Sequence, residues 1–275
     1  QESLSLYANL GINRVSIGVQ SFNDASLSAI GRRHSSQAAY KALDALASSG
    51  MNYNADLIYG QPGQSMEMWE RDLEQMLHFS PPHLSAYLLS YEPGTRLYAM
   101  LANGRISEAP EELAIGMYRL LCELTVKNGY GHYEISNFAK EGKQAVHNSL
   151  YWNYTPYLGL GASAHSFDGK IRRMNPCNTK EYLNTISAGA TACSLEDETA
   201  GNRYNDYIIT SLRTSAGYSP QFALERFGSG LTTQFNRNCI GLPSGMLELL
   251  PSGNMRIPER EWLKSDSILR ELIVD

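Results

Sequence analysis

The segment Tyr53-Asn54-Ala55-Asp56-Leu57-Ile58-Tyr59-Gly60 decides the fold, because it has the composition of a buried strand and lies between two helical patterns. One acidic residue, Asp56, stands in its middle. Burial of a carboxylate without a partner is costly. We therefore expect Asp56 to have a hydrogen-bonding partner or a ligand.

Strand and helix patterns alternate on both sides of this segment. Residues 13–20 alternate as a strand does, and a helical pattern covers 37–49. After the segment, residues 66–77 repeat apolar side chains at helical spacing, and 83–91 have strand composition. Three strand–helix units in succession predict parallel strands joined by right-handed crossovers. Either a barrel or a doubly wound sheet satisfies this pattern.

Polar residues fall at or near the carboxyl ends of the three predicted strands, namely Gln20, Asp56 and Ser90. In both candidate architectures ligands bind at these ends. The sequence therefore predicts a ligand site there. The cationic run Arg32-Arg33-His34 has the usual character of a solvated loop.

The second half of the chain contains a polar and aromatic run, residues 147–152, that we predict to be a strand, like residues 131–139. Its histidine offers an imidazole nitrogen to a metal such as iron, and Tyr151 and Trp152 offer flat faces to a planar ring system. Gly159 and Gly161 allow close approach of backbone or ligand. Together these features favour a pocket for a flat, metal-bearing molecule such as haem. The alternative is a half-buried strand with a satisfied core histidine, which is the more common fate of such residues.

The remaining segments resemble a small mixed region followed by a helical module. Asp168-Gly169 predicts a hairpin turn, and a helix is expected from Thr179 to Gly189. Beyond residue 202, helical patterns are followed by a hairpin at 246–257 and a closing helix at 262–272. This order predicts a winged-helix-like module. Because the module is not conspicuously basic, a docking role is favoured over DNA binding.

Composition sets the broad class. The chain has 275 residues, 43% of them hydrophobic, and a formal net charge of −5, which fits one or two globular domains and disfavours nucleic acid as a partner. No apolar run reaches the ~20 residues that a bilayer-spanning helix needs. The four cysteines have no CxxC or CxxxC spacing, so we expect free thiols in the cytoplasm. They are Cys122, Cys177, Cys193 and Cys239.

Several motifs in a fixed order resemble one family. Residues 16–22, 31–34, 56–63 and 133–138 are similar to the radical S-adenosylmethionine (SAM) proteins of the oxygen-independent coproporphyrinogen III oxidase group. The motif His147-Asn148-x-x-Tyr151-Trp152 resembles the haem-binding motif of that group's haem-chaperone branch. The resemblance covers essentially the whole chain.

The resemblance implies an α/β fold that is the second half of a partial (β/α)6 barrel. On this basis we expect three parts. Residues 1–109 would be the last three strand–helix units, 110–200 an α+β extension that carries the HNxxYW motif, and 201–275 a winged-helix-like domain.

Site residues follow from the same resemblance, position by position. Those implied to hold SAM are Gln20, Arg32, Asp56 and Ser90. Those implied to hold haem are His147, as the iron ligand, with Asn148, Tyr151 and Trp152. No catalytic residue is assigned.

One family feature is missing. The CxxxCxxC motif, whose thiolates hold a [4Fe–4S] cluster, would lie upstream of Gln1. We therefore expect this chain to be a C-terminal piece that does not hold the cluster and is inactive by itself.

The function implied is that of a haem chaperone, which binds haem and transfers it to an acceptor protein with the cluster and SAM in the full-length protein. The alternative is oxidative decarboxylation of coproporphyrinogen III to protoporphyrinogen IX, so whether the protein is an enzyme stays open. The expected partners are haem and a haem-accepting protein but no nucleic acid, and a homodimer is left open. The expected location is the cytoplasm, with membrane association through partners as an option.

Overall fold

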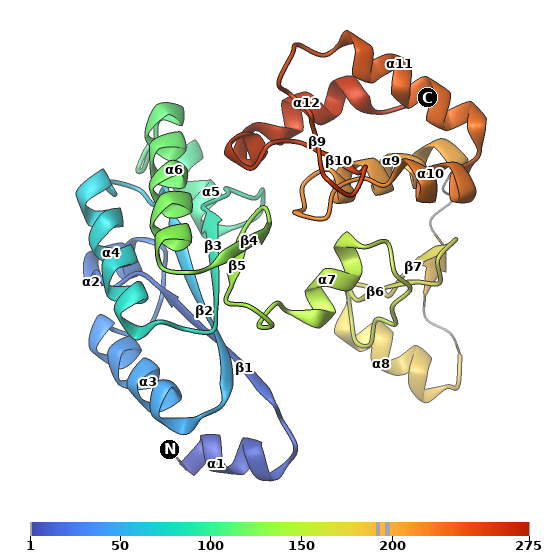
Figure 1. The fold of residues 1–275 in the computed structure, drawn as a ribbon. Coiled ribbons are helices and arrows are strands. Elements are labelled where there is room, and N and C mark those ends of the chain that lie inside the picture. Colours follow the sequence, from blue (N-terminus) through green and yellow to red (C-terminus); the bar gives the residue numbers. More distant parts are fainter. Residues whose placement is uncertain (1, 191–192, 196–198, 275) are drawn as a thin grey trace. The chain divides into compact units, whose positions relative to one another are not determined.

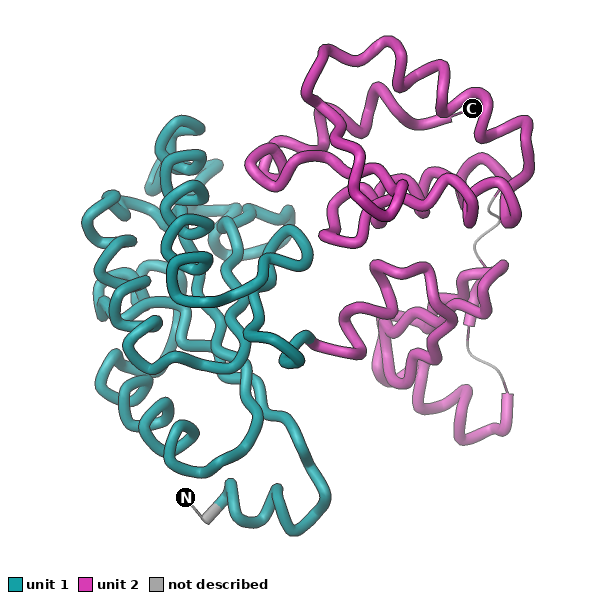
Figure 2. The backbone as a smooth tube through the Cα atoms, in the orientation of Figure 1, with its two compact units in different colours: residues 1–144 teal, residues 145–275 magenta. Residues whose placement is uncertain are grey.

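The computed structural model describes residues 2–190, 193–195 and 199–274, and the chain divides into two compact units, residues 1–144 and 145–275 (Figure 2). The three-part division at 109/110 and 200/201 stays a prediction, and its middle part includes positions outside the described residues.

The first unit is built on a five-stranded sheet with the order β1-β2-β3-β5-β4. Its strands are β1 (Arg14–Gln20), β2 (Asn52–Tyr59), β3 (His83–Leu88), β4 (Gly131–Glu134) and β5 (Asn137–Ala139). The strands β1, β2 and β3 are parallel, as predicted, and β5 pairs antiparallel with both β3 and β4. Residues 131–139 are thus a hairpin rather than one strand.

Six helices accompany this sheet in the described part of the unit. They are α1 (Glu2–Asn9), α2 (Asp24–Ala29), α3 (Ser36–Ser49), α4 (Met66–Phe79), α5 (Arg96–Ala102) and α6 (Glu111–Lys127). Figure 1 shows α3, α4 and α6 on the same side of the sheet. The side chains of Asn23, Ser35 and Ser65 accept from the first-turn amides of α2, α3 and α4, which explains where these helices begin. Helix α5 was not predicted.

Alternation along β2 separates a hydrophobic face from a polar face. Tyr53, Leu57 and Tyr59 are buried, and each such side chain is worth about 1.5–3 kcal/mol of transfer free energy. Asn54 and Asp56 point to the opposite face, because successive strand residues alternate. The polar residues of the strand therefore share one surface of the sheet.

The second unit begins with α7 (Val146–Trp152). The prediction of a strand over 147–152 is wrong. The amide of Ser149 donates to Ala145 and that of Asn153 to Ser149, both at 3.0 Å, which is helical spacing. A six-residue polar and aromatic run does not distinguish strand from helix. The i, i+4 spacing of His147 with Tyr151 was the informative signal, since it places both on one helical face.

A small antiparallel sheet and one helix follow α7. They comprise β6 (His165–Phe167), β7 (Arg172–Met174), α8 (Thr179–Ser187) and β8 (Ser194–Leu195), with strand order β6-β7-β8. The predicted turn at Asp168-Gly169 is confirmed, since Asp168 Oδ1 accepts from the amides of Lys170 and Ile171 at 2.9 and 2.8 Å.

Helices, a hairpin and a final helix complete the unit, in the order predicted for a winged-helix-like module. These are α9 (Ala200–Ser211), α10 (Pro220–Phe227), α11 (Ser229–Gly241), β9 (Glu248–Leu249), β10 (Met255–Arg256), η1 (Glu259–Lys264) and α12 (Ser265–Leu272). Aromatic side chains dominate the core here; the rings of Tyr218 and Phe235 lie 4.5 Å apart.

None of the helices within the described ranges combines the length and the apolar character that crossing a bilayer requires.

Candidate functional site

The carboxyl end of β1 holds Gln20 in an unusual conformation. Pairing with β2 is interrupted by a register shift between Gly18 and Gln20, and Gln20 has a φ of 69°, in the left-handed region. A Cβ on Gly18 would lie 2.5 Å from Gln20 Nε2, so the glycine leaves room for the glutamine side chain. Such strain at a strand end is typical of a binding site.

The buried side chain of Gln20 carries an oxygen, Oε1, that has no hydrogen-bond partner among the described residues. Neighbouring residues fix the backbone around it. Gln61 Nε2 donates to the carbonyl of Gln20 at 3.2 Å, and the buried Asp72 accepts from Ser21 Oγ at 2.7 Å and from the amide of Phe22 at 2.8 Å. Burial raises the pKa of Asp72, while these two hydrogen bonds favour its charged form. The unsatisfied oxygen is thus an acceptor in a fixed position.

Asp56 has the partners that its sequence position predicted, although it is only partly buried. Asn54 Nδ2 donates to Asp56 Oδ1 at 2.5 Å and to Ser16 Oγ at 2.9 Å. Ser16 Oγ lies 3.4 Å from the other carboxylate oxygen, at the long limit for a hydrogen bond. Asn54 therefore orients the carboxylate from the neighbouring position on the same face of β2.

Asn54 is itself held from β3 by His83. Asn54 Oδ1 lies 2.6 Å from His83 Nδ1, and Tyr133 Oη lies 2.7 Å from His83 Nε2. Burial, and secondarily the positive charge of Arg14, lowers the pKa of His83 to about 3, so its ring is neutral near pH 7. Because Asn54 offers an oxygen, Nδ1 carries the proton and Nε2 accepts from the tyrosine.

A directional chain of hydrogen bonds thus runs from Tyr133 through His83 and Asn54 to Asp56. Ser85 Oγ adds a second donor to Asn54 Oδ1, at 3.1 Å. Buried polar networks that are fully satisfied rigidify the site that they support. This network fixes the carboxylate of Asp56 in one orientation.

The other two residues of the predicted SAM group lie on loops. Arg32 and Ser90 are both exposed, and within residues 2–144 no hydrogen bond joins either side chain to Gln20 or Asp56. The structure brings Gln20 and Asp56 onto adjacent strands, where Asp56 pairs with Gly18.

The chemistry of these residues fits SAM. The unsatisfied Gln20 Oε1 and the Asp56 carboxylate are acceptors, which an ammonium group or ribose hydroxyls can donate to. The guanidinium of Arg32 matches a carboxylate. The assignment of these four residues to SAM stays a prediction.

In the second unit, α7 presents His147 and Tyr151 to solvent. Tyr151 Oη lies 2.9 Å from His147 Nε2, and the two rings meet edge to face with centroids 5.2 Å apart. The ring of Tyr157 packs edge to face on Tyr151 at 4.6 Å. His147 is therefore neither a core histidine nor part of a strand.

The opposite side of α7 faces the interior of the unit. The ring of Trp152 is partly buried, and the Arg213 guanidinium lies 5.7 Å from its centroid. Tyr154, with a φ of 54°, is buried against Phe167 at 4.8 Å and Phe227 at 5.7 Å. These contacts anchor the helix, so Trp152 is less available to a ligand than Tyr151. Asn148 is partly buried on the same helix.

The residues after α7 include exposed apolar side chains. Leu158 and Leu160 are 75% and 79% exposed, which is apolar surface that a porphyrin face could cover. Gly159 is required for backbone packing rather than for ligand access, because a Cβ there would lie within 3 Å of the backbone of His165. Gly161 has a φ of 104°, in the region that favours glycine. An exposed imidazole, an exposed phenol and apolar surface fit haem as a ligand.

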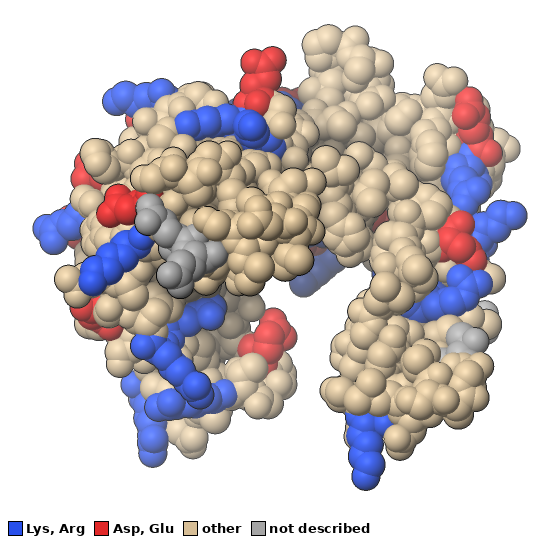
Figure 3. Space-filling model, turned by 90° about the horizontal axis from the view of Figure 1, so that it is seen from below, with Lys and Arg blue, Asp and Glu red and all other residues tan. Residues whose placement is uncertain are grey.

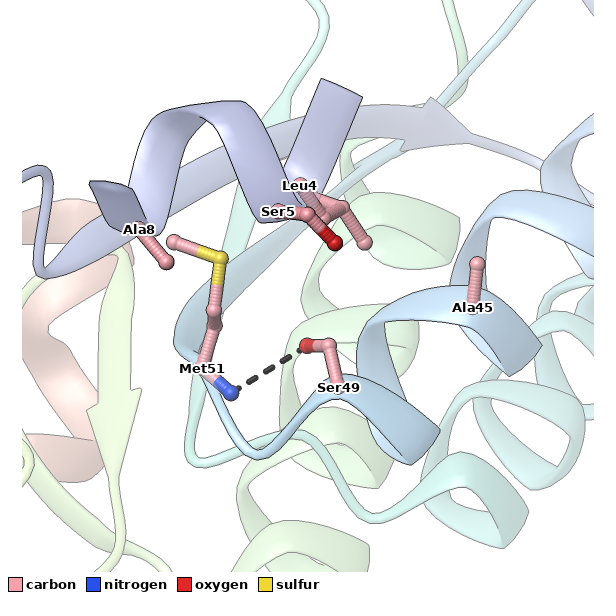
Figure 4. Close-up of a pocket in the computed structure, with 6 residues that line it drawn as sticks. All are labelled: Leu4, Ser5, Ala8, Ala45, Ser49 and Met51. Carbon is pink, nitrogen blue, oxygen red and sulfur yellow. Dashed lines mark hydrogen bonds between the residues drawn. The ribbon is translucent and has the colours of Figure 1, made fainter. Parts of the chain in front are cut away.

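A hollow of about 310 Å³ lies elsewhere in the first unit, between α1, the end of α3 and Met51, which leads into β2 (Figure 4). Figure 4 shows small and apolar side chains around it, and Ser49 Oγ accepts from the amide of Met51 at 3.1 Å. It lies at the amino ends of the parallel strands and contains no titratable side chain.

The face in Figure 3 is largely uncharged, and several basic side chains gather at the lower left of the view. Among the residues that the structure describes, no three of His, Cys, Asp and Glu lie together as a metal site.

The network residues Asn54, His83 and Tyr133 were not predicted as site residues. The alternation of Asn52, Asn54 and Asp56 indicated a polar face on β2, but His83 and Tyr133 are joined to it only by the fold. Asp72 was hidden within the hydrophobic pattern of α4.

Comparisons with known proteins agree with these features. Residues 1–76 match the model of the Radical SAM superfamily. The heme chaperone HemW of Bacillus subtilis is 33% identical over 236 residues, which cover 85% of this chain and 62% of that protein. HemW of Synechocystis sp. is 41% identical over 222 residues, which cover 79% and 54%. The chain thus spans little more than half the length of these relatives.

A solved structure shows the same fold. Coproporphyrinogen III oxidase (HemN) from Escherichia coli, described as a radical SAM enzyme, superposes with a TM-score of 0.78 at 18% identity, covering 99% of this chain and 67% of that one. This likeness concerns the fold alone. The sheet with three parallel strands belongs to a partial radical SAM barrel.

Proposed function

The chain belongs to the HemW-type radical SAM proteins, and from this membership we propose that the whole protein binds haem and transfers it to an acceptor protein. The observation that carries the proposal is the exposure of His147 on α7, beside the exposed ring of Tyr151. An imidazole nitrogen that solvent can reach is a suitable ligand for haem iron.

The roles of the remaining haem residues follow from their positions on α7. His147 ligates the iron, and Tyr151 lies against the porphyrin. Asn148 and Trp152 support the helix from its partly buried side. Because Tyr154 and Trp152 anchor α7, the imidazole is presented on a rigid element rather than on a loop.

SAM is assigned to the first unit. The unsatisfied oxygen of Gln20 and the oriented carboxylate of Asp56 would bind its donor groups, Arg32 would pair with its carboxylate, and Ser90 would contribute from the loop after β3. Together with a [4Fe–4S] cluster, SAM supplies one-electron chemistry to this protein family. No described residue is assigned to that cluster.

The proposal is tested by titrating the 275-residue chain with ferric haem and following the Soret band. We expect saturable binding in the wild type that His147→Ala abolishes. The matched control is His165→Ala, which removes a second exposed histidine of the same unit. Equal binding and equal spectra for His147→Ala and the wild type would contradict the proposal.

The fold likeness to a coproporphyrinogen III oxidase supports a second candidate, the oxidative decarboxylation of coproporphyrinogen III. Turnover of coproporphyrinogen III by the whole protein with a reconstituted cluster would support this candidate. Haem binding without turnover supports the chaperone. We further propose a cytoplasmic location, and the three-part domain division and a homodimer are additional proposals.

A further inference from the structure

The nitrogen through which His147 would bind iron is already engaged by Tyr151. Nε2 is the end of the ring farther from the backbone, whereas Nδ1 lies next to the carbon that carries Cβ. A porphyrin plane centred on Nδ1 would therefore meet the helix backbone, and Nε2 is the nitrogen suited to haem. In the structure, Nε2 lies 2.9 Å from the hydroxyl of Tyr151.

This contact blocks the lone pair in either tautomer of the histidine. If Nε2 accepts, the tyrosine hydroxyl donates into the lone pair that iron needs. If Nε2 carries the proton, it donates to the tyrosine oxygen, and no lone pair remains there. Iron can bind Nε2 only after the contact is broken.

Neighbouring side chains hold the ring of Tyr151 beside His147. His147 and Tyr151 are one helical turn apart on α7, which brings side chains of this spacing together. The Tyr151 ring is packed edge to face by His147 at 5.2 Å and by Tyr157 at 4.6 Å. Tyr157 is in turn held by two backbone hydrogen bonds with Phe167, of 2.8 and 2.9 Å.

We propose that Tyr151 is a reversible cap on His147, which lowers the affinity for haem and so helps its release. This inference rests on the proposed function. A carrier must give up its cargo, and a competing hydrogen bond that re-forms when haem leaves favours the empty state. The cap sets the affinity, whereas His147 provides the iron bond.

The test uses Tyr151→Phe, which keeps the ring and its packing but removes the hydroxyl. Ferric haem is titrated into the 275-residue chain and the Soret band is followed. We expect Tyr151→Phe to bind haem roughly fivefold more tightly than the wild type, which corresponds to one net hydrogen bond. Its spectrum should match that of the wild type, because the iron ligand is unchanged.

The matched control is Tyr98→Phe on α5, since Tyr98 is 40% exposed and Tyr151 is 41% exposed. This control should bind haem as the wild type does. Histidine ¹⁵N resonances of the haem-free chain provide a second measurement, because the His147 signal should move in Tyr151→Phe and stay in Tyr98→Phe.

Two kinds of failure are distinguishable. If the wild type binds haem through His147 but Tyr151→Phe binds equally or more weakly, the cap is excluded and the proposed function stands. Weaker binding with an altered spectrum would indicate that the tyrosine contacts the iron. If the wild type shows no haem binding that depends on His147, the proposed function itself fails.

Discussion

Asn54 is the residue on which the geometry of the first unit's site depends. Its amide group joins Asp56 to His83, and each of its polar atoms has at least one partner. A carboxylate held in this way cannot rotate freely to follow a ligand. Its orientation is set without a ligand, which would reduce the ordering cost of binding one.

Asn54→Leu should lower the free energy of unfolding by about 2–4 kcal/mol, because it leaves the Nδ1–H of His83 and the hydroxyl of Ser85 buried without their acceptor. The measurement is urea-induced unfolding followed by circular dichroism. Asn52→Leu is the matched control on the same face of β2. Because Asn52 Oδ1 has no hydrogen-bond partner among the described residues, its replacement should change stability by less than about 1 kcal/mol. Equal losses in the two variants would argue against the network.

His83 should make stability depend on pH. Its pKa is about 3 in the folded chain against an ordinary value of 6.5, so between these values the unfolded chain binds a proton that the folded chain does not. The contribution of the neutral His83 to the free energy of unfolding is complete above pH 6.5. It is lost as the pH falls toward 3, with a slope of up to ~1.4 kcal/mol per pH unit.

The measurement is the difference in free energy of unfolding between the wild type and His83→Gln, from pH 7 to pH 4. The stability advantage of the wild type should shrink as the pH falls. The exposed His78→Gln serves as the control. A difference that stays constant over this range would contradict a buried neutral histidine.

At the scale of single residues, the sequence predicted that Asp56 has a hydrogen-bonding partner, but it did not predict which residue that is. Asp56 was expected to have a partner because it stands inside a hydrophobic strand. Its network depends on Tyr133, which is 50 residues from His83, and this distance is bridged only when β3, β4 and β5 assemble. A single sequence does not contain that pairing.

At the scale of elements, the end of β1 is the feature that shapes the site. The register shift, the left-handed Gln20 and the missing side chain of Gly18 act together. The parallel order of β1, β2 and β3 was predictable because helical patterns separate them. The bulge was not predicted, although an isolated glycine within a strand pattern, here Gly18, is a signal of one.

Gly18→Ala should weaken the binding of SAM to the whole protein by about tenfold or more, because the new Cβ displaces the end of the Gln20 side chain. The fold should survive, since that side chain is flexible. Gly230→Ala on α11 is the control, because a Cβ there meets no atom within 4 Å. Calorimetric titration with SAM measures both variants, and an unchanged affinity in Gly18→Ala would remove Gln20 from the site.

Helix α7 shows where pattern-based prediction failed for a physical reason. Its seven residues are too few to establish a helical period, and only the i, i+4 spacing of His147 and Tyr151 indicated a helix. Much of its stability comes from packing, since Tyr154 and Trp152 attach it to the rest of the unit. The HNxxYW motif was identifiable from residue types, but its exposure on a helix was not.

At the scale of the whole molecule, two compact units carry different parts of the proposed activity. The residues assigned to SAM lie in residues 1–144, and those assigned to haem lie in residues 145–275. We therefore expect this chain to bind haem without the iron–sulfur cluster. The two activities are separable by experiment.

Anaerobic incubation of this chain with iron and sulfide should produce no [4Fe–4S] cluster, because the described residues offer no group of three metal ligands. Electron paramagnetic resonance after reduction measures this, and the same preparation should still bind haem. A stoichiometric cluster signal would show that the chain supplies its own ligands.

The bond between iron and His147 is the central claim, and resonance Raman spectroscopy of the haem-loaded chain in the ferrous state tests it most directly. We predict an iron–histidine stretching band that shifts on ⁵⁴Fe substitution and is absent from His147→Ala but present in His165→Ala. A wild-type spectrum without such a band, or the same band in His147→Ala, would contradict the account.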